Sequence, residues 1–458
     1  MAVIFIAHKL KLTRKQIPGR IFVYAITLLY PAYIICFLKS KNTRSFSSSP
    51  VKALLFGIPS NDNQYNWANF IINTIIFAMT QDFLWSPLLL LPASNVAFAR
   101  LGHVTDVSAK VVARVPPPNW VSQDSYDGTD HEPLARVIYK TRDSENSWLD
   151  GPTFAGASPE SDWMDTVTLE NLWPSNDYDY SVVYLDGKRI PGIPETLPLR
   201  TSPDPKLTSI KASMWGGNGG TKLSFVSGSC VTLGFPYRPA GHFRIPGFDL
   251  LAEHIKKHTM DFMIFLGDFI YADIPLSIGT SPENYWRKYR QTMSSDSFRK
   301  VYEQLPFYHM YDDHEIANNY AGQDNLNVSP YREAMIAWKA YNSAGNPDAL
   351  TPNHSYFSFD YGDVAFFTLD TRAHRSANQE DDGPEKTMLG ETQKIALLEW
   401  LSEVNNTATF KFISSSVPLT QLWKGVDGHL DTWAGFKNER KWLLDILQVG
   451  YYSNHMLC

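Results

Sequence analysis

Short apolar runs that end in acidic side chains recur in the second half of the chain, and they constrain the fold more than any other feature. Residues 263–266 form one such run and lead into Asp268, and residues 364–367 form another and lead into Asp370. Helical patterns lie between the strand-like runs. Because strands alternate with helices, we predict an α/β layered fold for residues 221–448, with ligand chemistry at the strand ends.

Four polar clusters follow strand-like runs in this region. They are Gly228-Ser229-Cys230, Gly267-Asp268 with Tyr271-Ala272-Asp273, Asp312-Asp313-His314-Glu315 with Asn318-Asn319, and Leu369-Asp370-Thr371-Arg372. Thiolate, carboxylate and phenolate groups bind metals, histidine transfers protons, and arginine makes bidentate contacts with phosphate. Each cluster alone has an ordinary structural explanation. Together they predict a metal-dependent phosphoryl hydrolase.

Two other enzyme classes are disfavoured by the sequence. It has no Gly-rich phosphate loop followed by lysine, which argues against a kinase or ATPase. It has no Gly-x-Ser-x-Gly motif, which argues against an α/β-hydrolase esterase.

The N-terminal region has a different character from the rest of the chain. Residues 21–38 carry no charge, and their length is close to the minimum for a membrane span. A second apolar stretch, residues 67–91, contains Asp82. We expect two spans that form a hairpin in an anchoring region at 1–92, with a second segment that lies at the membrane interface as the alternative. This predicts an integral membrane protein whose partners include the lipid bilayer.

Residues 93–205 show short apolar runs separated by Pro, Gly, Asn and Asp. This pattern predicts a small all-β sandwich. Residues 172–180 resemble the tyrosine-corner region of fibronectin-type domains. We find no catalytic constellation in this segment, so we expect a structural role for it.

Overall composition excludes some other classes. The net charge is −6, from 41 basic and 47 acidic residues, so the sequence has no nucleic-acid-binding signature. Three cysteines among 458 residues are too few for a disulfide framework.

Residues 223–448 resemble the PhoD-like (alkaline phosphatase D) metallophosphatases. The resemblance rests on the four clusters above, on Leu389-Gly390 with Gln393, and on Ser414-Ser415-Ser416-Val417-Pro418. It implies an α+β layered metallophosphatase sandwich preceded by a small fibronectin-like sandwich, and membrane-anchored fungal members look similar at the N-terminus. It also implies hydrolysis of phosphoric monoesters or diesters, in which a metal-activated hydroxide attacks phosphorus in line.

The resemblance also implies a set of metal ligands. By it, Cys230, Asp268 and Tyr271 hold Fe(III), and Asp268 bridges to Ca²⁺ or another divalent cation. Asp313 and Asn319 are expected on the side of the second metal.

Residues that act on the phosphate ester substrate follow from the same resemblance. His314 is expected to donate a proton or to orient the phosphate. Arg372 is expected to clamp the phosphate during catalysis, and Asn318 is a further candidate for substrate binding.

The sequence departs from the family pattern near its end. Family members continue with a further strand and a Gly-Asp-Arg-His-type loop that supplies late metal ligands, whereas residues 449–458 form an atypical tail with neither. We therefore expect an incomplete phosphatase domain at 221–448, truncated at its C-terminus. The alternative function is a catalytically inactive family member that acts as a membrane-tethered binding module.

Overall fold

The computed structural model describes most of the chain. The residues that it describes are 19–39, 51, 54, 62–89, 93–117, 134–142, 147–208, 210, 220–234, 241, 243–273, 280–420, 425–451 and 456–457. The chain divides into two compact units, one containing residues 1–92 with two short later segments and the other containing most residues from Ala93 onward.

Two long helices lie in the N-terminal unit. Helix α2 (Gly19–Lys39) and helix α4 (Asn63–Leu89) pack through aromatic rings. Tyr30 stacks on Phe77 with ring centroids 3.9 Å apart, and Phe37 stacks on Phe70 at 4.6 Å. Since a later residue of α2 faces an earlier residue of α4, the helices run antiparallel.

The prediction that these helices are membrane spans is not supported. Within the described residues, no helix is both long and apolar enough to cross a membrane. Helices do form over residues 21–38 and over residues 67–89 of the second predicted segment, but α4 carries polar side chains among its apolar ones. Asn73 donates to the carbonyl oxygen of Asn69 at 2.8 Å, and Ser86 donates to Asp82 at 2.6 Å.

Two antiparallel sheets form the β-domain that follows. One contains, in order, β1 (Phe98–Val104), β2 (Ala109–Arg114) and β5 (Met164–Leu169), and the other β4 (Leu149–Thr153), β3 (Ala135–Thr141), β6 (Asp177–Tyr184) and β7 (Leu197–Arg200). Val111, Val137 and Val182 belong to an apolar core that both sheets share. The N–H of Trp173 donates to the Tyr178 hydroxyl at 2.8 Å, which is the contact of a tyrosine corner. The fibronectin-like class of this domain stays a prediction.

The α/β region that follows the β-domain contains two further sheets. The first has parallel strands in the order β10 (Phe307–His309), β9 (Phe262–Phe265) and β8 (Phe225–Gly228), and the second has β11 (Phe357–Tyr361), β12 (Val364–Thr368), β13 (Phe410–Ser414) and β14 (Met456–Leu457). Side chains alternate between the two faces of each strand. Phe262 and Ile264 share a core with Phe366 of the second sheet, whereas Met263 and Phe265 pack in the core of the helices on the other face.

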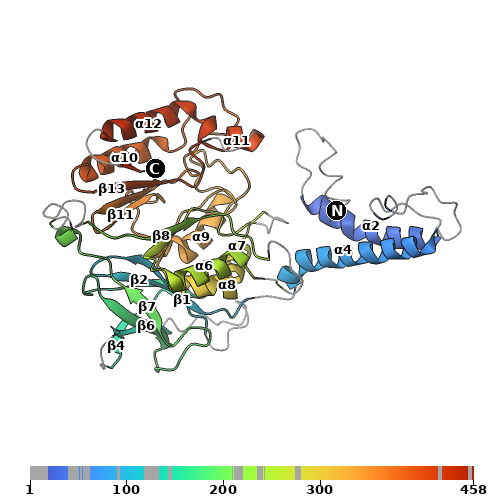
Figure 1. Cartoon of the computed structure of the whole chain (residues 1–458), viewed down its shortest axis with the longest axis horizontal. Helices are drawn as coiled ribbons and strands as arrows, with labels where there is room; N and C mark the ends of the chain where they lie inside the picture. Colours follow the sequence, from blue (N-terminus) through green and yellow to red (C-terminus); the bar gives the residue numbers. More distant parts are fainter. Residues whose placement is uncertain are drawn as a thin grey trace. The chain divides into compact units, whose positions relative to one another are not determined.

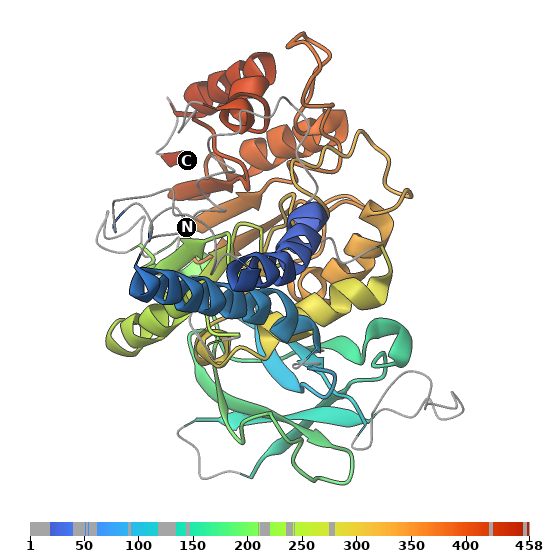
Figure 2. The ribbon, with the colours of Figure 1, turned by 90° about the vertical axis from the view of Figure 1, so that its right-hand side faces the viewer.

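Helices cover the outer faces of these two sheets. Helices α6 (Pro246–Lys257), α7 (Pro282–Met293), α8 (Asp296–Tyr302) and α9 (Tyr331–Tyr341) share a core with the first sheet, and α10 (Gly390–Val404) and α12 (Lys437–Tyr451) share one with the second. Shorter elements are η3 (Pro159–Ser161), η5 (Ser343–Gly345), α11 (Val426–Leu430) and η6 (Trp433–Gly435). Figures 1 and 2 show the helix–sheet–sheet–helix layers. The predicted α/β layered fold class is confirmed.

Strand β14 corrects one expectation from the sequence. No further strand was expected after the last helix, yet Met456 and Leu457 pair in parallel with Lys411 and Phe412 of β13. Helix α12 also extends to Tyr451, into the segment predicted as an atypical tail. Residues 452–455 and 458 of that tail lie outside the described residues.

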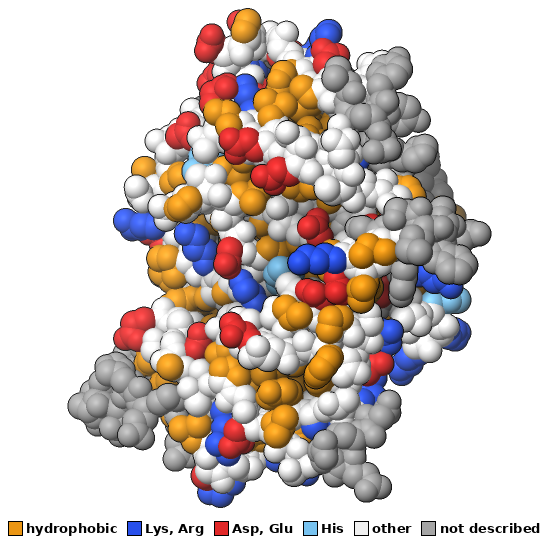
Figure 3. Space-filling model, turned by 90° about the vertical axis from the view of Figure 1, so that its left-hand side faces the viewer, with side chains coloured by type: hydrophobic (Ala, Val, Ile, Leu, Met, Phe, Trp, Pro, Cys, Tyr) orange, Lys and Arg blue, Asp and Glu red, His pale blue; other side chains and the backbone are white. Residues whose placement is uncertain are grey.

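The face of the molecule in Figure 3 carries acidic, basic and apolar side chains side by side. No broad patch of one charge gathers among the described residues on this face. It therefore offers no strong electrostatic attraction to a polyanion. The lack of a nucleic-acid partner stays a prediction.

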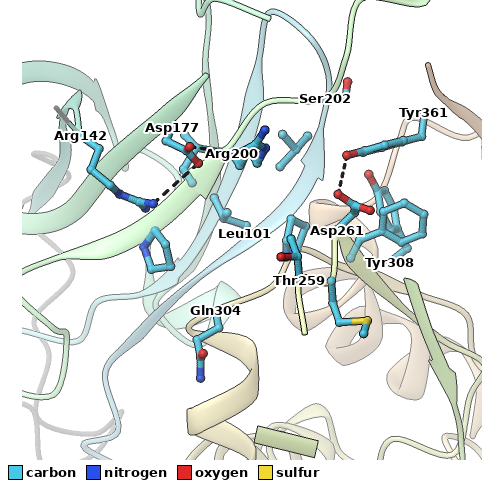
Figure 4. Close-up of a pocket in the computed structure, with 16 residues that line it drawn as sticks. Leu101, Arg142, Asp177, Arg200, Ser202, Thr259, Asp261, Gln304, Tyr308 and Tyr361 are labelled. Carbon is cyan, nitrogen blue, oxygen red and sulfur yellow. Dashed lines mark hydrogen bonds and ion pairs between the residues drawn. The ribbon is translucent and has the colours of Figure 1, made fainter. Parts of the chain in front are cut away.

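A small cavity of about 80 Å³ lies where the β-domain meets the α/β region (Figure 4). On the β-domain side, Arg200 pairs with Asp177 at 3.0 Å, and Arg142 points towards the same carboxylate. On the other side, the Tyr361 hydroxyl donates to Asp261 at 2.6 Å. The charged groups that line the cavity pair with one another, so it offers little uncompensated charge to a ligand.

Buried ion pairs join the same two regions. Asp162, which is 5% exposed, accepts hydrogen bonds from Arg114 of β2 at 2.9 Å and Arg290 of α7 at 2.8 Å. The hydroxyl of Tyr341 in α9 also donates to Asp162. Charges are costly to bury unless they are paired, so this cluster holds the β-domain in one position against the helices.

Replacing Asp162 tests this junction. Asp162→Ala leaves two buried guanidinium groups without their shared partner, and we expect the free energy of unfolding to fall by about 3–5 kcal/mol. The matched control is Asp150→Ala, which removes a 63% exposed partner of Arg136 and should change that free energy by less than about 1 kcal/mol. Chemical denaturation of the full chain measures both values, and equal effects would contradict the assigned role of the cluster.

Candidate metal centre

The parallel strands of the first sheet bring three of the four predicted clusters together. Cys230 follows β8, Asp268 follows β9, and Asp313 follows β10. Because these strands are parallel neighbours, their carboxyl ends meet at one edge of the sheet. The N–H of Cys230 donates to the carbonyl oxygen of Gly267 at 3.2 Å, which ties the first loop to the second.

Asp268 lies between the other two predicted Fe(III) ligands. Its Oδ2 accepts from the Cys230 Sγ at 3.2 Å and from the Tyr271 hydroxyl at 3.2 Å. Asp268 is buried, whereas Cys230 is exposed. A thiol, a carboxylate and a phenol therefore meet within hydrogen-bond distance, as the sequence analysis expected.

Titration behaviour in this group reflects crowded anionic ligands. Partial loss of contact with water, and then the charge of Asp268, raises the pKa of the Cys230 thiol to about 11. Burial and the charge of Asp268 likewise raise the pKa of the Tyr271 hydroxyl. Burial and the charge of Asp312 raise the pKa of Asp268. Each group resists ionisation because it is shielded from water and because its neighbours would also be negative. A bound cation would offset both effects, so the ligand set fits a metal ion.

Left-handed backbone conformations occur at three of the candidate ligands. The φ angle is 62° at Cys230, 56° at Asp268 and 59° at Asn319. This conformation costs a residue with a Cβ about 1–2 kcal/mol. Such strain concentrates at functional sites, where the surrounding structure enforces it.

On the other side of Asp268 lies the candidate site for a second metal. Asp268, Asp313 and His314 each offer one ligand atom, and these atoms lie within 4.8 Å of one another. The carboxylate of Asp313 accepts the backbone N–H of Asn319. Burial, opposed by Arg372, raises the pKa of Asp313. Asp313 and Asn319 are thus adjacent, as the predicted second-metal side requires.

His314 is held in place by Asp273. Its Nδ1 lies 2.7 Å from an Asp273 oxygen, and its ring centroid is 4.3 Å from that of Tyr271. Burial lowers the pKa of His314, but the hydrogen bond to Asp273 and the charge of Asp313 outweigh this and raise it to about 9. A protonated imidazole can donate a proton. The predicted role of His314, to donate a proton or to orient the phosphate, stays a prediction.

Asn318 lies beside this pair, because its backbone N–H donates to Asp273 at 2.7 Å. The Asn318 residue is exposed. Its predicted contact with substrate stays a prediction. Asp273 had no predicted role, and its position two residues after Tyr271 was the available signal.

Arg372 is surrounded by carboxylates. Its side chain is 1% exposed, and its Nε donates to Asp312 at 2.5 Å. Its other two nitrogens donate to the two oxygens of Asp431 at 2.7 and 3.0 Å, and one of them lies 3.4 Å from Asp313. The predicted phosphate clamp stays a prediction. Asp431 was missed because it is a lone acid in a loop far along the chain.

Glu315 organises the loops that carry the candidate ligands, although the sequence analysis gave it no role. Its carboxylate is buried and accepts the N–H groups of Asp268 at 3.0 Å, Phe269 at 2.5 Å and Asp312 at 2.8 Å. Gly267 permits this close approach: its φ is 110°, and a Cβ there would lie 2.6 Å from the Asp312 Cβ. One carboxylate therefore ties the loop after β9 to the loop after β10.

An α/β sandwich with thiol, carboxylate and imidazole groups at the ends of parallel strands is the arrangement of a metallophosphatase. A family model described as PhoD-like phosphatase matches residues 225–457, about half of the chain. The chain therefore belongs to the PhoD-like phosphatase family. The family suggests a metal-dependent phosphoesterase.

Individual proteins with known functions or structures are also similar to this chain. Alkaline phosphatase D of Bacillus subtilis (strain 168) is 23% identical over 246 residues, which cover 45% of this chain and 42% of that protein. The chain thus spans less than half the length of this relative. A solved structure of PhoD is similar with a TM-score of 0.56 and 18% identity, covering 78% of this chain and 69% of that one. A purple acid phosphatase from yellow lupin (Lupinus luteus) seeds has a TM-score of 0.45 and 14% identity, covering 70% and 50%.

Replacing Glu315 separates its effect on the metal site from its effect on stability. Glu315→Gln keeps the shape but turns an acceptor oxygen into a donor that faces backbone N–H groups. We expect the free energy of unfolding to fall by about 1–3 kcal/mol and iron affinity to fall about 10–100-fold, measured by competition with a chelator.

The matched control is Glu439→Gln. Glu439 is 6% exposed and accepts the N–H groups of Met388 at 3.2 Å and Leu389 at 3.0 Å, in a part of the fold that holds none of the candidate ligands. It should lose a similar free energy of unfolding and keep its iron affinity. An equal loss of iron in both variants would show that Glu315 acts only through general stability.

Proposed function

We propose that this protein hydrolyses phosphoric monoesters or diesters with the help of bound metal ions. The observation that carries the proposal is the convergence of Cys230, Asp268, Tyr271 and Asp313 at the ends of parallel strands, in a chain of the PhoD-like family. Activity on phosphate esters in the named relative, an alkaline phosphatase, supports the same class of substrate.

We further propose which residues hold the metals. Cys230, Asp268 and Tyr271 would hold Fe(III), and Asp268 with Asp313 would hold Ca²⁺ or another divalent cation, with Asn319 beside it. Bound metal ions lower the pKa of a coordinated water and neutralise charge on phosphate oxygens.

The remaining chemistry falls to side chains around these ligands. His314, kept protonated by Asp273, would donate a proton to the leaving-group oxygen. Arg372 would attract the phosphate through its guanidinium group, and the exposed Asn318 would contact the substrate at the mouth of the site.

Loss of one predicted iron ligand tests the enzyme proposal. The full chain, purified and supplied with iron and calcium, should hydrolyse a chromogenic phosphate ester. Cys230→Ala should lower the rate by more than about 100-fold, because losing a direct ligand disturbs a metal site more than losing its supporting hydrogen bonds does. If iron-containing wild-type protein hydrolyses the ester no faster than Cys230→Ala does, the proposal is wrong.

A tyrosinate bound to Fe(III) gives a visible absorption band, and this band tests the metal assignment without turnover. We expect the band in the iron-loaded wild type and its loss in Tyr271→Phe. Tyr139→Phe, in the β-domain, is the matched control and should keep the band. A colourless, iron-free wild-type protein would count against the assignment.

Attachment to a membrane is also a proposal that rests on the sequence. Helices α2 and α4 expose large apolar side chains, among them Leu28, Leu29 and Ile75. If they hold the protein in a membrane, the full chain should stay with the membrane fraction through alkaline carbonate extraction. Release of the whole protein into the soluble fraction would contradict this.

A further inference from the structure

Several hydrogen-bond donors converge on the carboxylate of Asp431. Arg372 donates to both of its oxygens, at 2.7 and 3.0 Å. Arg375 lies 3.0 Å from its Oδ1, and the amide of Asn378 donates to the same oxygen at 3.1 Å. All three donor residues come from the loop after β12, whereas Asp431 comes from the segment between α11 and η6.

A single carboxylate does not match this set of donors well. Three of the four contacts fall on Oδ1, although one carboxylate oxygen has only two lone pairs. Arg375 is fully buried, and no described residue accepts a hydrogen bond from its Nε or Nη1. A phosphate group has three strongly accepting terminal oxygens, so it would satisfy more of these donors than Asp431 does.

Arg375 makes one direct contact with an anionic group among the described residues, the carboxylate of Asp431. Burial, and then the neighbouring positive charge of Arg372, lowers its pKa to about 10, although the charges of Asp431, Asp312 and Asp313 oppose this shift. Its other described contacts are the carbonyl oxygen of Leu430 at 3.2 Å and the aromatic ring of Phe436, 4.9 Å from the guanidinium carbon. These neighbours carry no negative charge, so Arg375 would gain from a second anionic oxygen.

We propose that Arg372, Arg375 and Asn378 form a binding site for a phosphate group, and that Asp431 occupies this site as a mimic when no phosphate is bound. The proposal rests on the proposed function, because it assigns the site to the phosphate of substrate or product. The site adjoins the candidate metal centre, since Asp312 and Asp313 contact the guanidinium group of Arg372.

Local structure allows Asp431 to leave without refolding the segment around it. Trp433, two residues after Asp431, is buried, and its Nε1 donates to the Ser415 hydroxyl at 3.1 Å. Thr432 donates to the carbonyl oxygen of Gly428 at 3.0 Å. These contacts fix the backbone on both sides of Asp431, whose side chain is 14% exposed. We therefore expect Asp431 to leave the arginines by rotation of its side chain, without movement of the backbone.

Binding of inorganic phosphate to the full chain tests the proposal, by calorimetry on metal-loaded protein and again after metal removal by a chelator. Asp431→Asn removes the competing charge. If the Asp431 carboxylate occupies the site about nine-tenths of the time, this substitution should tighten phosphate binding about tenfold, both in metal-loaded and in metal-free protein. Arg375→Lys in the Asp431→Asn background should reverse the gain, because lysine lacks the planar fork of donors.

Two controls separate a vacated site from a simple change of charge. Asp312→Asn removes a negatively charged partner of Arg372 but leaves Asp431 in place, so it should tighten phosphate binding far less than Asp431→Asn does. Asp445→Asn, which alters an exposed carboxylate on α12, should not change it. Equal gains for Asp312→Asn and Asp431→Asn would overturn the proposal.

The variant also has to fold. Should Asp431→Asn be too unstable for calorimetry, its melting temperature should rise more with added phosphate than that of the wild type, since a ligand stabilises the state that binds it. An equal rise in both proteins would again overturn the proposal. Because binding after metal removal needs no turnover, an inactive enzyme would leave this result intact, and an active enzyme without the gain would contradict only this inference.

Discussion

The candidate site depends on the ion pairs of one buried guanidinium group, that of Arg372. Its side chain is 1% exposed, and it pairs with Asp312 and Asp313 after β10 and with Asp431 before η6. A buried charge that loses its partners costs several kcal/mol. The loop after β10 and the segment before η6 must therefore lie close to the loop after β12, which carries Arg372. Glu315 then ties the loop that carries Asp312 to the loop that carries Asp268. Together, the two residues set the distances among the candidate ligands.

These contacts give the site two electrostatic sides. Towards β8 and β9, thiol, phenol and carboxylate groups crowd together, and burial and mutual repulsion raise their pKa values. Towards the loop after β12, two buried arginines share the carboxylate of Asp431. The first side favours cations and the second favours anions. A phosphate ester bound to metal ions needs both environments next to each other, and the cluster of candidate ligands and the two arginines supply them.

The parts of this arrangement that the sequence predicts are those that follow directly from strand order. Cys230, Asp268 and Asp313 each lie just after a strand, and parallel pairing of those strands brings them together. Asp431 and Glu315 could not be assigned in this way, because their roles depend on which distant loop approaches them. Strand β14 has only two residues, too few for a periodic pattern. The apolar stretch that becomes α4 has the length of a span, but it also carries polar residues such as Asn73 and Asp82. Length and apolar content alone therefore do not decide whether such a helix crosses a membrane or lies at its surface.

Arg372 also links the two sides of the site to each other. Asp313 lies 3.4 Å from one of its terminal nitrogens, and that same nitrogen donates to Asp431 at 3.0 Å. In the proposed function, a cation and the guanidinium group compete for the carboxylate of Asp313, while phosphate and Asp431 compete for the guanidinium group. A cation that binds Asp313 in place of Arg372 leaves more of the positive charge of Arg372 for the anion that it still contacts, either phosphate or Asp431. By thermodynamic linkage the effect is reciprocal, so phosphate binding and metal binding should depend on each other even though different residues contact the two ligands.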